Sequence, residues 1–453
     1  MGKALLLTVS LVFLQYVSLV SPYVLLCYYI RSSNQRLPSI MFYPENIDPC
    51  LCTHLIYSDN KEIANTYHWK DDPLFKRFTD LKKNNKNLKT LYGFGGWSFG
   101  ISRFSIIAAK LDSRIQFINS AVPFLRKHGF DGLDLDWRYP GYRGTGNNDK
   151  YHFTIFMKEL MEAFIAEAQT SGKDRLLLTA PVAANKKDID AGYEIAEVSK
   201  YLDFISVLTL QFNGPWNKLT AHNSPLHRGS ADKGEQRNFN VDYVLKYWRD
   251  RGAPAAKLLV TFPTYGNSYI LKTSKTGIGA PVTVGGSISP YTGQRGFLPY
   301  HEICPFLKGA TKKMIEDQKV PYAFKGNEWV GYDDQQSFKT KAQWLKDNNF
   351  GGATLWTLDM DDYSGTHCNQ GLYPLTNTLK TALGISNSEC KSSFITSPQE
   401  VELKTWCSDQ PNGFYPFPID SHKYFNCARG HSYIMSCPAG LNFDISCHCC
   451  DIE

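Results

Sequence analysis

The sequence reads Phe130-Asp131-Gly132-Leu133-Asp134-Leu135-Asp136-Trp137-Arg138-Tyr139-Pro140-Gly141 in the stretch that decides the fold, and here charged residues alternate with apolar ones. Side chains alternate between the two faces of a strand, so Asp134, Asp136 and Arg138 would share one face, with neighbours roughly 6–7 Å apart. Burying such a row costs free energy unless the charges are paired or hydrogen-bonded. The stretch therefore indicates either a functional site or a self-compensating Asp–Arg ladder. The alternative is an edge strand with a solvated polar face.

The composition is that of an ordinary globular protein. The 453 residues are 43 % hydrophobic and 20 % charged, which is enough chain for more than one domain and for a large buried core. The formal net charge of +6 is small for this length, and no run of five or more basic residues occurs. We therefore expect no nucleic-acid partner.

The first 21 residues are typical of a secretory signal peptide. A basic start, Met1-Gly2-Lys3, is followed by an apolar run over residues 4–14. Cleavage after Ser21 would leave bulky Leu19 at the other position that should be small. We predict residues 1–21 as a signal peptide and a secreted, extracellular protein without a membrane partner. The alternative is an uncleaved anchor, although the run is short against the about 20 residues of a spanning helix.

Twelve cysteines imply disulfides in a secreted chain, and their distribution is uneven. Six are scattered over the larger body, at Cys27, Cys50, Cys52, Cys304, Cys368 and Cys390. Six more crowd into the end of the chain, at Cys407, Cys427, Cys437, Cys447, Cys449 and Cys450. The terminal C-x-C-C spacing lacks the partner pair of a tetrahedral zinc site, so no metal or cofactor is implied.

Eight short apolar runs recur along the larger body. They cover residues 24–30, 53–57, 90–94, 132–136, 176–181, 204–210, 258–263 and 352–357. Segments with helical periodicity lie between them, for example residues 114–127 and 151–168. Buried strands that alternate with helices indicate a parallel α/β fold, and eight units predict a (β/α)8 barrel. The wide spacing of the last two runs predicts a small α+β insertion at about residues 266–336, between strand 7 and helix 7.

The opening stretch resembles the signature of family 18 glycoside hydrolases, the chitinases, which reads D-G-x-D-x-D-W-E-Y-P. Nine of the ten positions match, and the exception is Arg138, which stands where the family has its catalytic glutamate. Segments 261–266, 326–333 and 351–356 also read like chitinase sequences. The resemblance implies a TIM barrel over residues 22–385, with the insertion that some of these enzymes carry.

The end of the chain resembles a peritrophin-type chitin-binding module. Residues 386–404 form a polar linker, and residues 405–453 contain the module-like segments 412–416, 424–427 and 437–444. A domain this short cannot bury enough apolar surface to be stable by itself, and three disulfides would stabilise it. Its large aromatics exceed what such a core needs, and we expect some to bind chitin: Tyr415, Tyr424, Phe425, Tyr433 and Phe443. The alternative is that they fill space between the disulfides.

The resemblance also implies disulfides in the larger body. It suggests that Cys27 pairs with Cys52 and Cys304 with Cys368, which leaves Cys50 and Cys390 as a third pair. Spacing alone does not choose among the pairings, in the body or in the module.

Catalysis in the family depends on a carboxylic acid at the position of Arg138. The resemblance implies a substrate-assisted mechanism, in which the sugar's N-acetyl oxygen attacks while this acid protonates the leaving oxygen. Arginine keeps its protons, because its pKa exceeds about 12. Losing a general acid typically costs on the order of 10²–10⁴ in rate. We expect Arg138 to pair with Asp136 and the hydrolytic centre, Asp134, Asp136 and Arg138, to be disabled.

Two further departures from the family alter the same cleft. The sixth strand of chitinases usually ends in M-x-Y-D, but this chain reads Leu208-Thr209-Leu210-Gln211. Leu210 cannot donate a hydrogen bond, and Gln211 lacks the charge that stabilises an oxazolinium-like intermediate. Ser32 stands where the family usually has a tryptophan of the sugar cleft.

Other positions still match those that line the sugar groove of the family. They are Gly95, Gly96, Trp97, Tyr139, Trp216, Tyr265, Trp329 and Trp356. Aromatic faces suit the apolar faces of sugar rings, although each of these residues could instead belong to the core. We expect Trp356 to form the groove floor.

These observations predict a secreted, monomeric chitinase-like protein that binds chitin or chitooligosaccharides. One alternative is an active endochitinase, which hydrolyses β-1,4-N-acetylglucosamine linkages with a proton from Asp136 or a neighbour. Another is a barrel that binds no sugar, with residues 405–453 as the only competent part.

Overall fold

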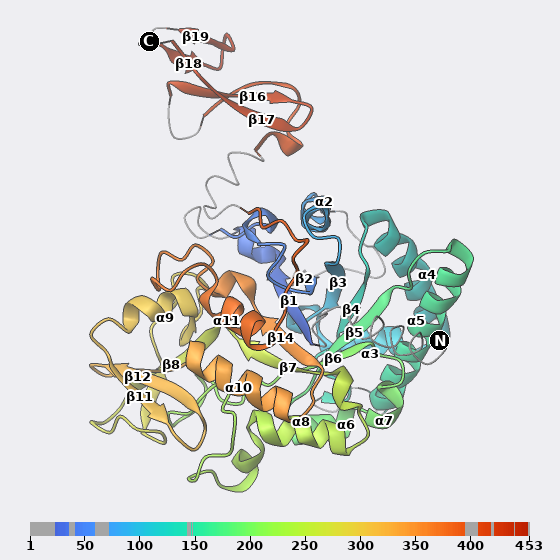
Figure 1. The fold of residues 1–453 in the computed structure, drawn as a ribbon, viewed down its shortest axis with the longest axis vertical. Helices are drawn as coiled ribbons and strands as arrows, with labels where there is room; N and C mark the ends of the chain where they lie inside the picture. The colour runs from blue at the N-terminus through green and yellow to red at the C-terminus, as the bar shows by residue number, and fades with distance from the viewer. Residues whose placement is uncertain are drawn as a thin grey trace, which may run out of the picture.

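The computed structural model describes residues 23–35, 41–58, 72–142, 146, 148–394, 406–417, 421–438 and 440–451. The predicted signal peptide and most of the predicted linker lie outside these residues. Figure 1 shows a large body built around a barrel and a small C-terminal module beyond it. Among the helices of the described ranges, none has the length and hydropathy of a membrane-spanning segment.

Eight parallel strands close into a barrel, which confirms the predicted (β/α)8 fold. In barrel order they are β1 (Val24–Ile30), β2 (His54–Ser58), β3 (Lys89–Gly95), β4 (Gly132–Asp136), β5 (Leu177–Val182), β6 (Phe204–Val207), β7 (Leu258–Pro263) and β14 (Gly352–Trp356). The ring closes between β1 and β14, where Val24 lies opposite Gly352. Leu26, Tyr28, Ile30, Ile56, Leu91 and Leu259 fill its interior.

Strand β6 ends at Val207, three residues before the end of the predicted run. The chain turns away at this point, because the amide of Thr209 donates to the carbonyl of Val207 and the amide of Leu210 to that of Leu208. Leu210 and Gln211 therefore lie in the loop beyond the strand.

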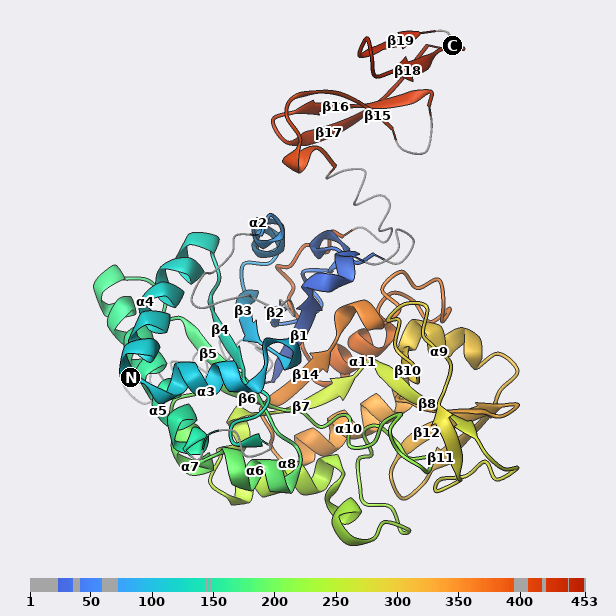
Figure 2. The same ribbon diagram turned by 180° about the vertical axis from the view of Figure 1, so that it is seen from behind.

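Helices surround the barrel on its outside, as Figures 1 and 2 show. The main ones are α2 (Leu74–Thr79), α3 (Ile101–Ala109), α4 (Leu111–His128), α5 (Asp149–Ser171), α6 (Lys186–Gly192), α7 (Ile195–Val198), α8 (Val241–Asp250), α10 (Gln335–Asp347) and α11 (Pro374–Ala382). The predicted helical segments 114–127 and 151–168 lie within α4 and α5. Helix α4 ends where Gly129 adopts the left-handed conformation, and α10 begins with a capping box between Asp334 and Ser337.

The predicted insertion is a six-stranded sheet with one helix, between β7 and α10. It consists of β8 (Tyr265–Leu271), β9 (Val282–Gly285), β10 (Phe297–Pro299), α9 (Tyr300–Phe306), β11 (Thr311–Ile315), β12 (Val320–Lys325) and β13 (Glu328–Gly331). Trp329 lies in the core of this sheet, stacked on Tyr322 with ring centroids 5.3 Å apart. The expectation that Trp329 lines a sugar groove is therefore wrong, because its side chain is fully buried.

The C-terminal module contains two small antiparallel sheets. One joins β15 (Gly413–Pro416), β16 (Lys423–Ala428) and β17 (His431–Ser436), and the other joins β18 (Asn442–Asp444) and β19 (Cys449–Asp451). Phe425 is fully buried and packs with Phe417 and the Cys407–Cys427 disulfide. Phe425 is thus part of the module's core, which corrects the expectation that it contacts chitin.

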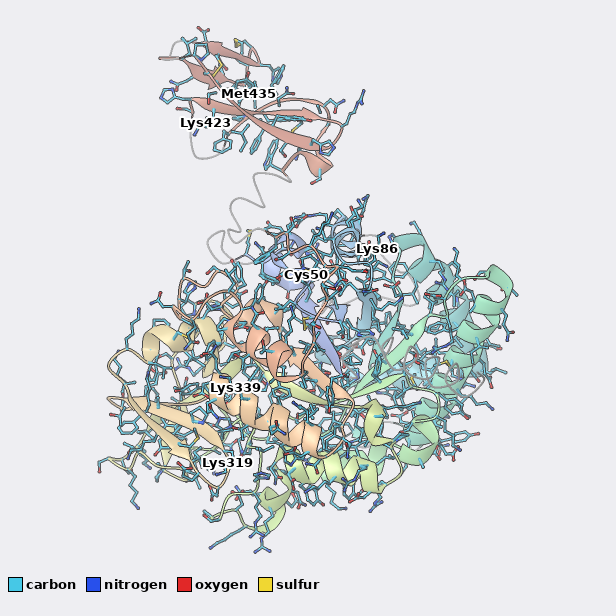
Figure 3. All side chains as sticks on the ribbon, viewed as in Figure 1. Cys50, Lys86, Lys319, Lys339, Lys423 and Met435 are labelled. Atoms are coloured by element: carbon cyan, nitrogen blue, oxygen red, sulfur yellow. A yellow bond between two sulfur atoms is a disulfide. The ribbon has the colours of Figure 1, made fainter. Side chains whose placement is uncertain are left out.

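Six disulfides account for all twelve cysteines. In the body the bonds are Cys27–Cys52, Cys50–Cys390 and Cys304–Cys368, the pairing that the family resemblance implies. Cys50, labelled in Figure 3, precedes β2, and its partner follows α11. In the module the bonds are Cys407–Cys427, Cys437–Cys450 and Cys447–Cys449.

Candidate functional site

The alternating charges of β4 meet at the carboxyl end of the barrel strands. Asp134 is fully buried and accepts two hydrogen bonds, from the Tyr28 hydroxyl at 2.7 Å and from Thr179 Oγ1 at 2.6 Å. Burial raises the pKa of Asp134 to about 7, although these two bonds act in the opposite direction. Tyr28 and Thr179 were not predicted as site residues, since they come from β1 and β5, far away in the sequence.

Arg138 and Asp136 form a two-pronged ion pair. Nε of Arg138 donates to Oδ1 of Asp136 at 2.6 Å, and Nη2 donates to Oδ2 at 2.8 Å. The side chains are 12 % and 4 % exposed, so the pair is almost out of water. Burial lowers the pKa of Arg138, but the carboxylate of Asp136 more than offsets this and holds the pKa above its usual range. The predicted Asp–Arg pair is confirmed.

Arg138 also contacts the aromatic ring of Trp356. The guanidinium of Arg138 lies 4.7 Å from the centre of the Trp356 ring, which is the distance of a cation–π contact. The ring of Tyr28 packs on the same tryptophan with centroids 4.7 Å apart. Trp356 itself is only half-buried at the end of β14. Arg138 is therefore clamped between a carboxylate and an aromatic face.

This arrangement lacks an available general acid among the described residues of the β4 row. Arg138 does not give up a proton, and both oxygens of Asp136 accept hydrogen bonds from it. Asp134 has a pKa suited to proton transfer, but it has no exposed surface and its oxygens are held by Tyr28 and Thr179. None of these three side chains therefore offers a proton that is both exposed and readily given up.

An apolar cluster adjoins the charged pair. Leu210 and the buried Tyr265 pack with Tyr291, Met360 and Trp356. Burial raises the pKa of Tyr265 above its usual value, so its hydroxyl stays protonated. Gln211 follows Leu210 with an exposed side chain, and its left-handed backbone is held by a bond from its amide to Oδ1 of Asn223 at 2.7 Å.

The turn after β3 brings further aromatic residues toward β4. A Cβ on Gly95 would lie 2.4 Å from the carbonyl oxygen of Asp136, and the amide of Gly96 donates to that same oxygen at 2.8 Å. Both glycines have positive φ, so the close approach depends on glycine at these positions. Trp97 follows with 61 % exposure and lies 6.3 Å from the ring of Tyr142, which in turn contacts Tyr139.

Two other predicted cleft positions lie on loops. Trp216 is 67 % exposed in the loop after β6, which leaves its ring free to meet a ligand. Ser32 is half-buried in the short helical turn Arg31–Gln35 that follows β1.

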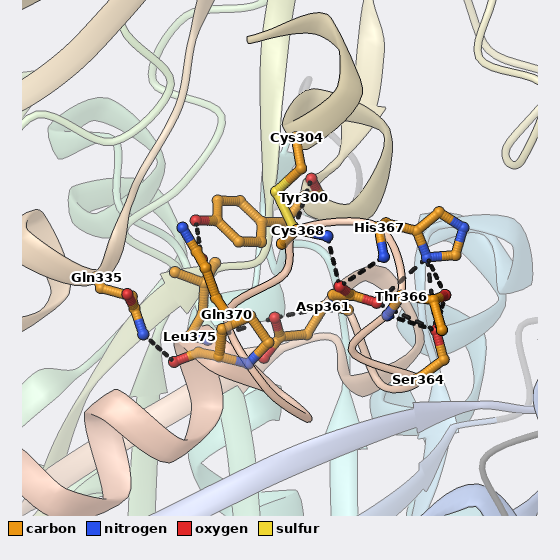
Figure 4. The surroundings of a disulfide bond; sticks show 12 residues. Tyr300, Cys304, Gln335, Asp361, Ser364, Thr366, His367, Cys368, Gln370 and Leu375 are labelled. Atoms are coloured by element: carbon orange, nitrogen blue, oxygen red, sulfur yellow. Dashed lines mark hydrogen bonds and ion pairs between the residues drawn. A yellow bond between two sulfur atoms is a disulfide. The ribbon is translucent and has the colours of Figure 1, made fainter. Parts of the chain in front are cut away.

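The three aspartates behind Trp356 serve the fold. Asp361 accepts bonds from the amide and hydroxyl of Thr376, and Asp362 accepts one from the amide of Cys368 at 2.8 Å. Figure 4 shows Asp361 and the hydrogen bonds around the Cys304–Cys368 disulfide, which joins the insertion to the loop after β14. Asp359 accepts bonds from Thr357 and Tyr291. All three carboxylates are fully buried, so they anchor the loop that carries Trp356.

The module presents a second candidate surface. Strand register places Phe414, Tyr424, Tyr433 and Met435 on one face of the three-stranded sheet, which we call the aromatic face. Phe414, Tyr433 and Met435 are 41 %, 51 % and 42 % exposed, and Tyr424 stacks on Phe443 at 4.9 Å. Tyr415 lies on the opposite face with Trp406 and Phe425. Phe414 and Met435 were not among the predicted contacts.

Comparison with protein families identifies both parts of the chain. Residues 24–361 match the family of Glycosyl hydrolases family 18, and residues 407–453 match the Chitin binding Peritrophin-A domain. The chain is 42 % identical to chitotriosidase-1 of Mus musculus over 442 residues, which cover 94 % of each protein. It is 46 % identical to chitinase-3-like protein 2 of Homo sapiens over 369 residues, covering 80 % of this chain and 93 % of the relative.

The same likeness extends to solved structures. Human YKL-39, described as a pseudo-chitinase with retained chitooligosaccharide binding properties, superposes with a TM-score of 0.74 at 45 % identity, covering 80 % of this chain and all of that one. The immunomodulatory active chitinase TsES1 of Trichuris suis superposes with a TM-score of 0.75 at 35 % identity, with the same coverage. The chain belongs to glycosyl hydrolase family 18 and carries a chitin-binding module of the peritrophin-A type.

Proposed function

We propose that this member of glycosyl hydrolase family 18 binds chitin or chitooligosaccharides and does not hydrolyse them. The observation that carries the proposal is the two-pronged ion pair between Arg138 and Asp136, clamped against Trp356. A general acid contributes typically 10²–10⁴ in rate, and a fixed cation at its position also opposes the positive charge that develops on the sugar.

Changes beyond β4 support the same proposal. Leu210 offers neither a hydroxyl nor a charge to a reacting N-acetyl group, and the exposed side chain of Gln211 has no charge. Restoring a carboxylic acid at position 138 alone would therefore leave the N-acetyl group without a hydroxyl or a negative charge at these positions.

Binding surfaces remain at both ends of the molecule. In the barrel, the half-buried ring of Trp356 packs on an apolar cluster that includes Tyr265 and Leu210, and the exposed rings of Trp97 and Trp216 offer stacking faces for sugar rings. In the module, the aromatic face offers exposed rings on a rigid, disulfide-linked sheet. The relative YKL-39 is described as a pseudo-chitinase that keeps chitooligosaccharide binding, which gives a precedent for losing one activity without the other.

An assay on chitin beads tests where binding resides. The full chain is compared with a chain ending at Phe394, which keeps Cys390 for its bond with Cys50 and keeps the contact of Phe394 with Tyr373. Retention of the full chain alone would assign bead binding to the module, and retention of both would assign a share to the barrel. Retention of neither would refute the chitin-binding proposal.

A second assay tests the loss of hydrolysis. Release of a fluorescent leaving group from an N-acetylglucosamine oligomer is measured at acidic and neutral pH. We expect no release above the uncatalysed rate. Turnover by the natural protein, abolished by Asp134→Asn or Asp136→Asn, would instead support an active endochitinase that uses one of these carboxyl groups.

A further inference from the structure

The end of the chain carries a disulfide between two cysteines with a single residue between them. Cys447 and Cys449 are two positions apart, whereas the other five bonds join cysteines 13 to 340 positions apart. The stabilisation that a disulfide gives by restricting the unfolded chain falls as the closed loop shortens. The Cys447–Cys449 bond therefore contributes the least of the six to stability by this route.

This bond is also the most open to solvent. Cys447 and Cys449 are both exposed, and so is His448 between them. Each of the other five bonds consists of buried or half-buried cysteines. Exposed disulfides are the ones that exchange most readily with thiols, because attack requires a thiolate to approach one sulfur in line with the bond.

Contacts other than the disulfide hold this turn in place. Cys449 lies opposite Asp444 in the β18–β19 pair, and Oδ1 of Asp444 accepts a bond from the amide of Ser446 at 2.7 Å. Nδ1 of His448 lies 3.3 Å from the carbonyl oxygen of Phe414, to which it donates, and so ties the turn to the larger sheet. The two sulfurs would stay close after reduction, ready to form the bond again.

We propose that Cys447–Cys449 is a thiol-exchange site for low-molecular-weight thiols such as glutathione. The thiolate of one glutathione attacks one sulfur, the S–S bond breaks, and a mixed disulfide forms while the other cysteine leaves as a thiolate and takes a proton from water. A second glutathione thiolate attacks the mixed disulfide and releases oxidised glutathione. Two thiols thus supply the two electrons that reduce the protein bond.

The neighbouring disulfide is placed to stay out of this exchange. Cys450 follows Cys449 directly but is bonded to Cys437 and is half-buried. Successive side chains of a strand point to opposite faces, so a thiolate on Cys449 faces away from the Cys437–Cys450 bond. The exchange is independent of sugar binding and of the proposed loss of hydrolysis.

Site-resolved labelling tests the proposal on the full chain. The protein is equilibrated in glutathione buffers of rising reduced-to-oxidised ratio, quenched with N-ethylmaleimide and mapped by mass spectrometry after proteolysis. Cys447 and Cys449 should be labelled at a ratio at least about tenfold lower than any other cysteine, with a glutathione adduct on one of them at intermediate ratios. The matched variant Cys447→Ser/Cys449→Ser should show no labelling in that range.

Two results would contradict the proposal. Labelling of Cys437 and Cys450 at the same ratio, or no labelling of Cys447 and Cys449 before the chain unfolds, overturns the proposal. The labelling order in the natural protein decides the question even if the double variant does not fold.

Discussion

Replacing Asp136 by asparagine should destabilise the barrel strongly, because it leaves the Arg138 charge without its carboxylate. The two side chains are 4 % and 12 % exposed, so water replaces the lost partner only in part. Removing one member of a buried ion pair typically costs 3–5 kcal/mol. The ring of Trp356, 4.7 Å from the guanidinium, continues to stabilise the cation and offsets up to about 2 kcal/mol. We therefore expect Asp136→Asn to lower the free energy of unfolding by about 3 kcal/mol.

Urea-induced unfolding followed by circular dichroism measures this cost. The double variant Asp136→Leu/Arg138→Met removes both charges at once, so it should be clearly more stable than Asp136→Asn. The matched control is Glu197→Gln, which breaks the exposed ion pair with Lys200 and should leave the unfolding midpoint unchanged. A cost of Asp136→Asn below about 1 kcal/mol would show that water reaches the guanidinium, and the clamped pair would no longer support the proposed loss of hydrolysis.

Three further results are expected. The pKa of Asp134 is raised to about 7 in the folded protein, so between about pH 4 and 7 the folded state binds a proton that the unfolded state has lost, and this group makes stability fall as the pH rises. In Asp134→Asn, this part of the pH dependence should vanish from unfolding curves. An unchanged slope would contradict the prediction. Arg138→Glu should restore at most a trace of oligomer hydrolysis, since Leu210 and Gln211 still offer the N-acetyl group neither a hydroxyl nor a negative charge. A rise of about 10⁴ would show that Arg138 alone disables the enzyme. Tyr433→Ala should weaken retention on chitin beads without changing the fold of the module. Phe425→Ala should unfold the module, because it lowers the free energy of unfolding by about 3–5 kcal/mol, which thermal melts would detect. Equal retention of Tyr433→Ala and the natural chain would show that the aromatic face is not a binding surface.

The barrel could be predicted because each of its strands is an apolar run set off by a helix. The pairing of Asp136 with Arg138 was also predicted, from the rule that residues two apart on a strand share a face, although β4 ends at Asp136 and Arg138 lies in the bend that follows it. The end of β6 was harder to predict, because the turn at Leu208 depends on hydrogen bonds that no local sequence pattern indicates.

Contacts between distant parts of the chain account for what the sequence did not reveal. Tyr28 reaches Asp134 across the barrel from a strand 106 positions away, and only the closed ring brings them together. A large aromatic residue gives the same sequence signal in a core and in a groove, which is why the sequence did not separate the buried Trp329 and Phe425 from the half-buried Trp356. Cysteine spacing in the module admits many pairings, and the bond between Cys437 and Cys450 depends on how the folded chain brings these two residues together.

The seam between β1 and β14, together with the Cys50–Cys390 bond, bears on how the protein is made. Val24 pairs with Gly352, and Cys50 forms its disulfide with Cys390, 340 positions later in the chain. At a synthesis rate of about 5–20 residues per second, tens of seconds pass between the synthesis of β1 and that of β14. During that interval β1 and Cys50 would both lack their final partners, so we expect the barrel to complete its folding only after Cys390 has been synthesised.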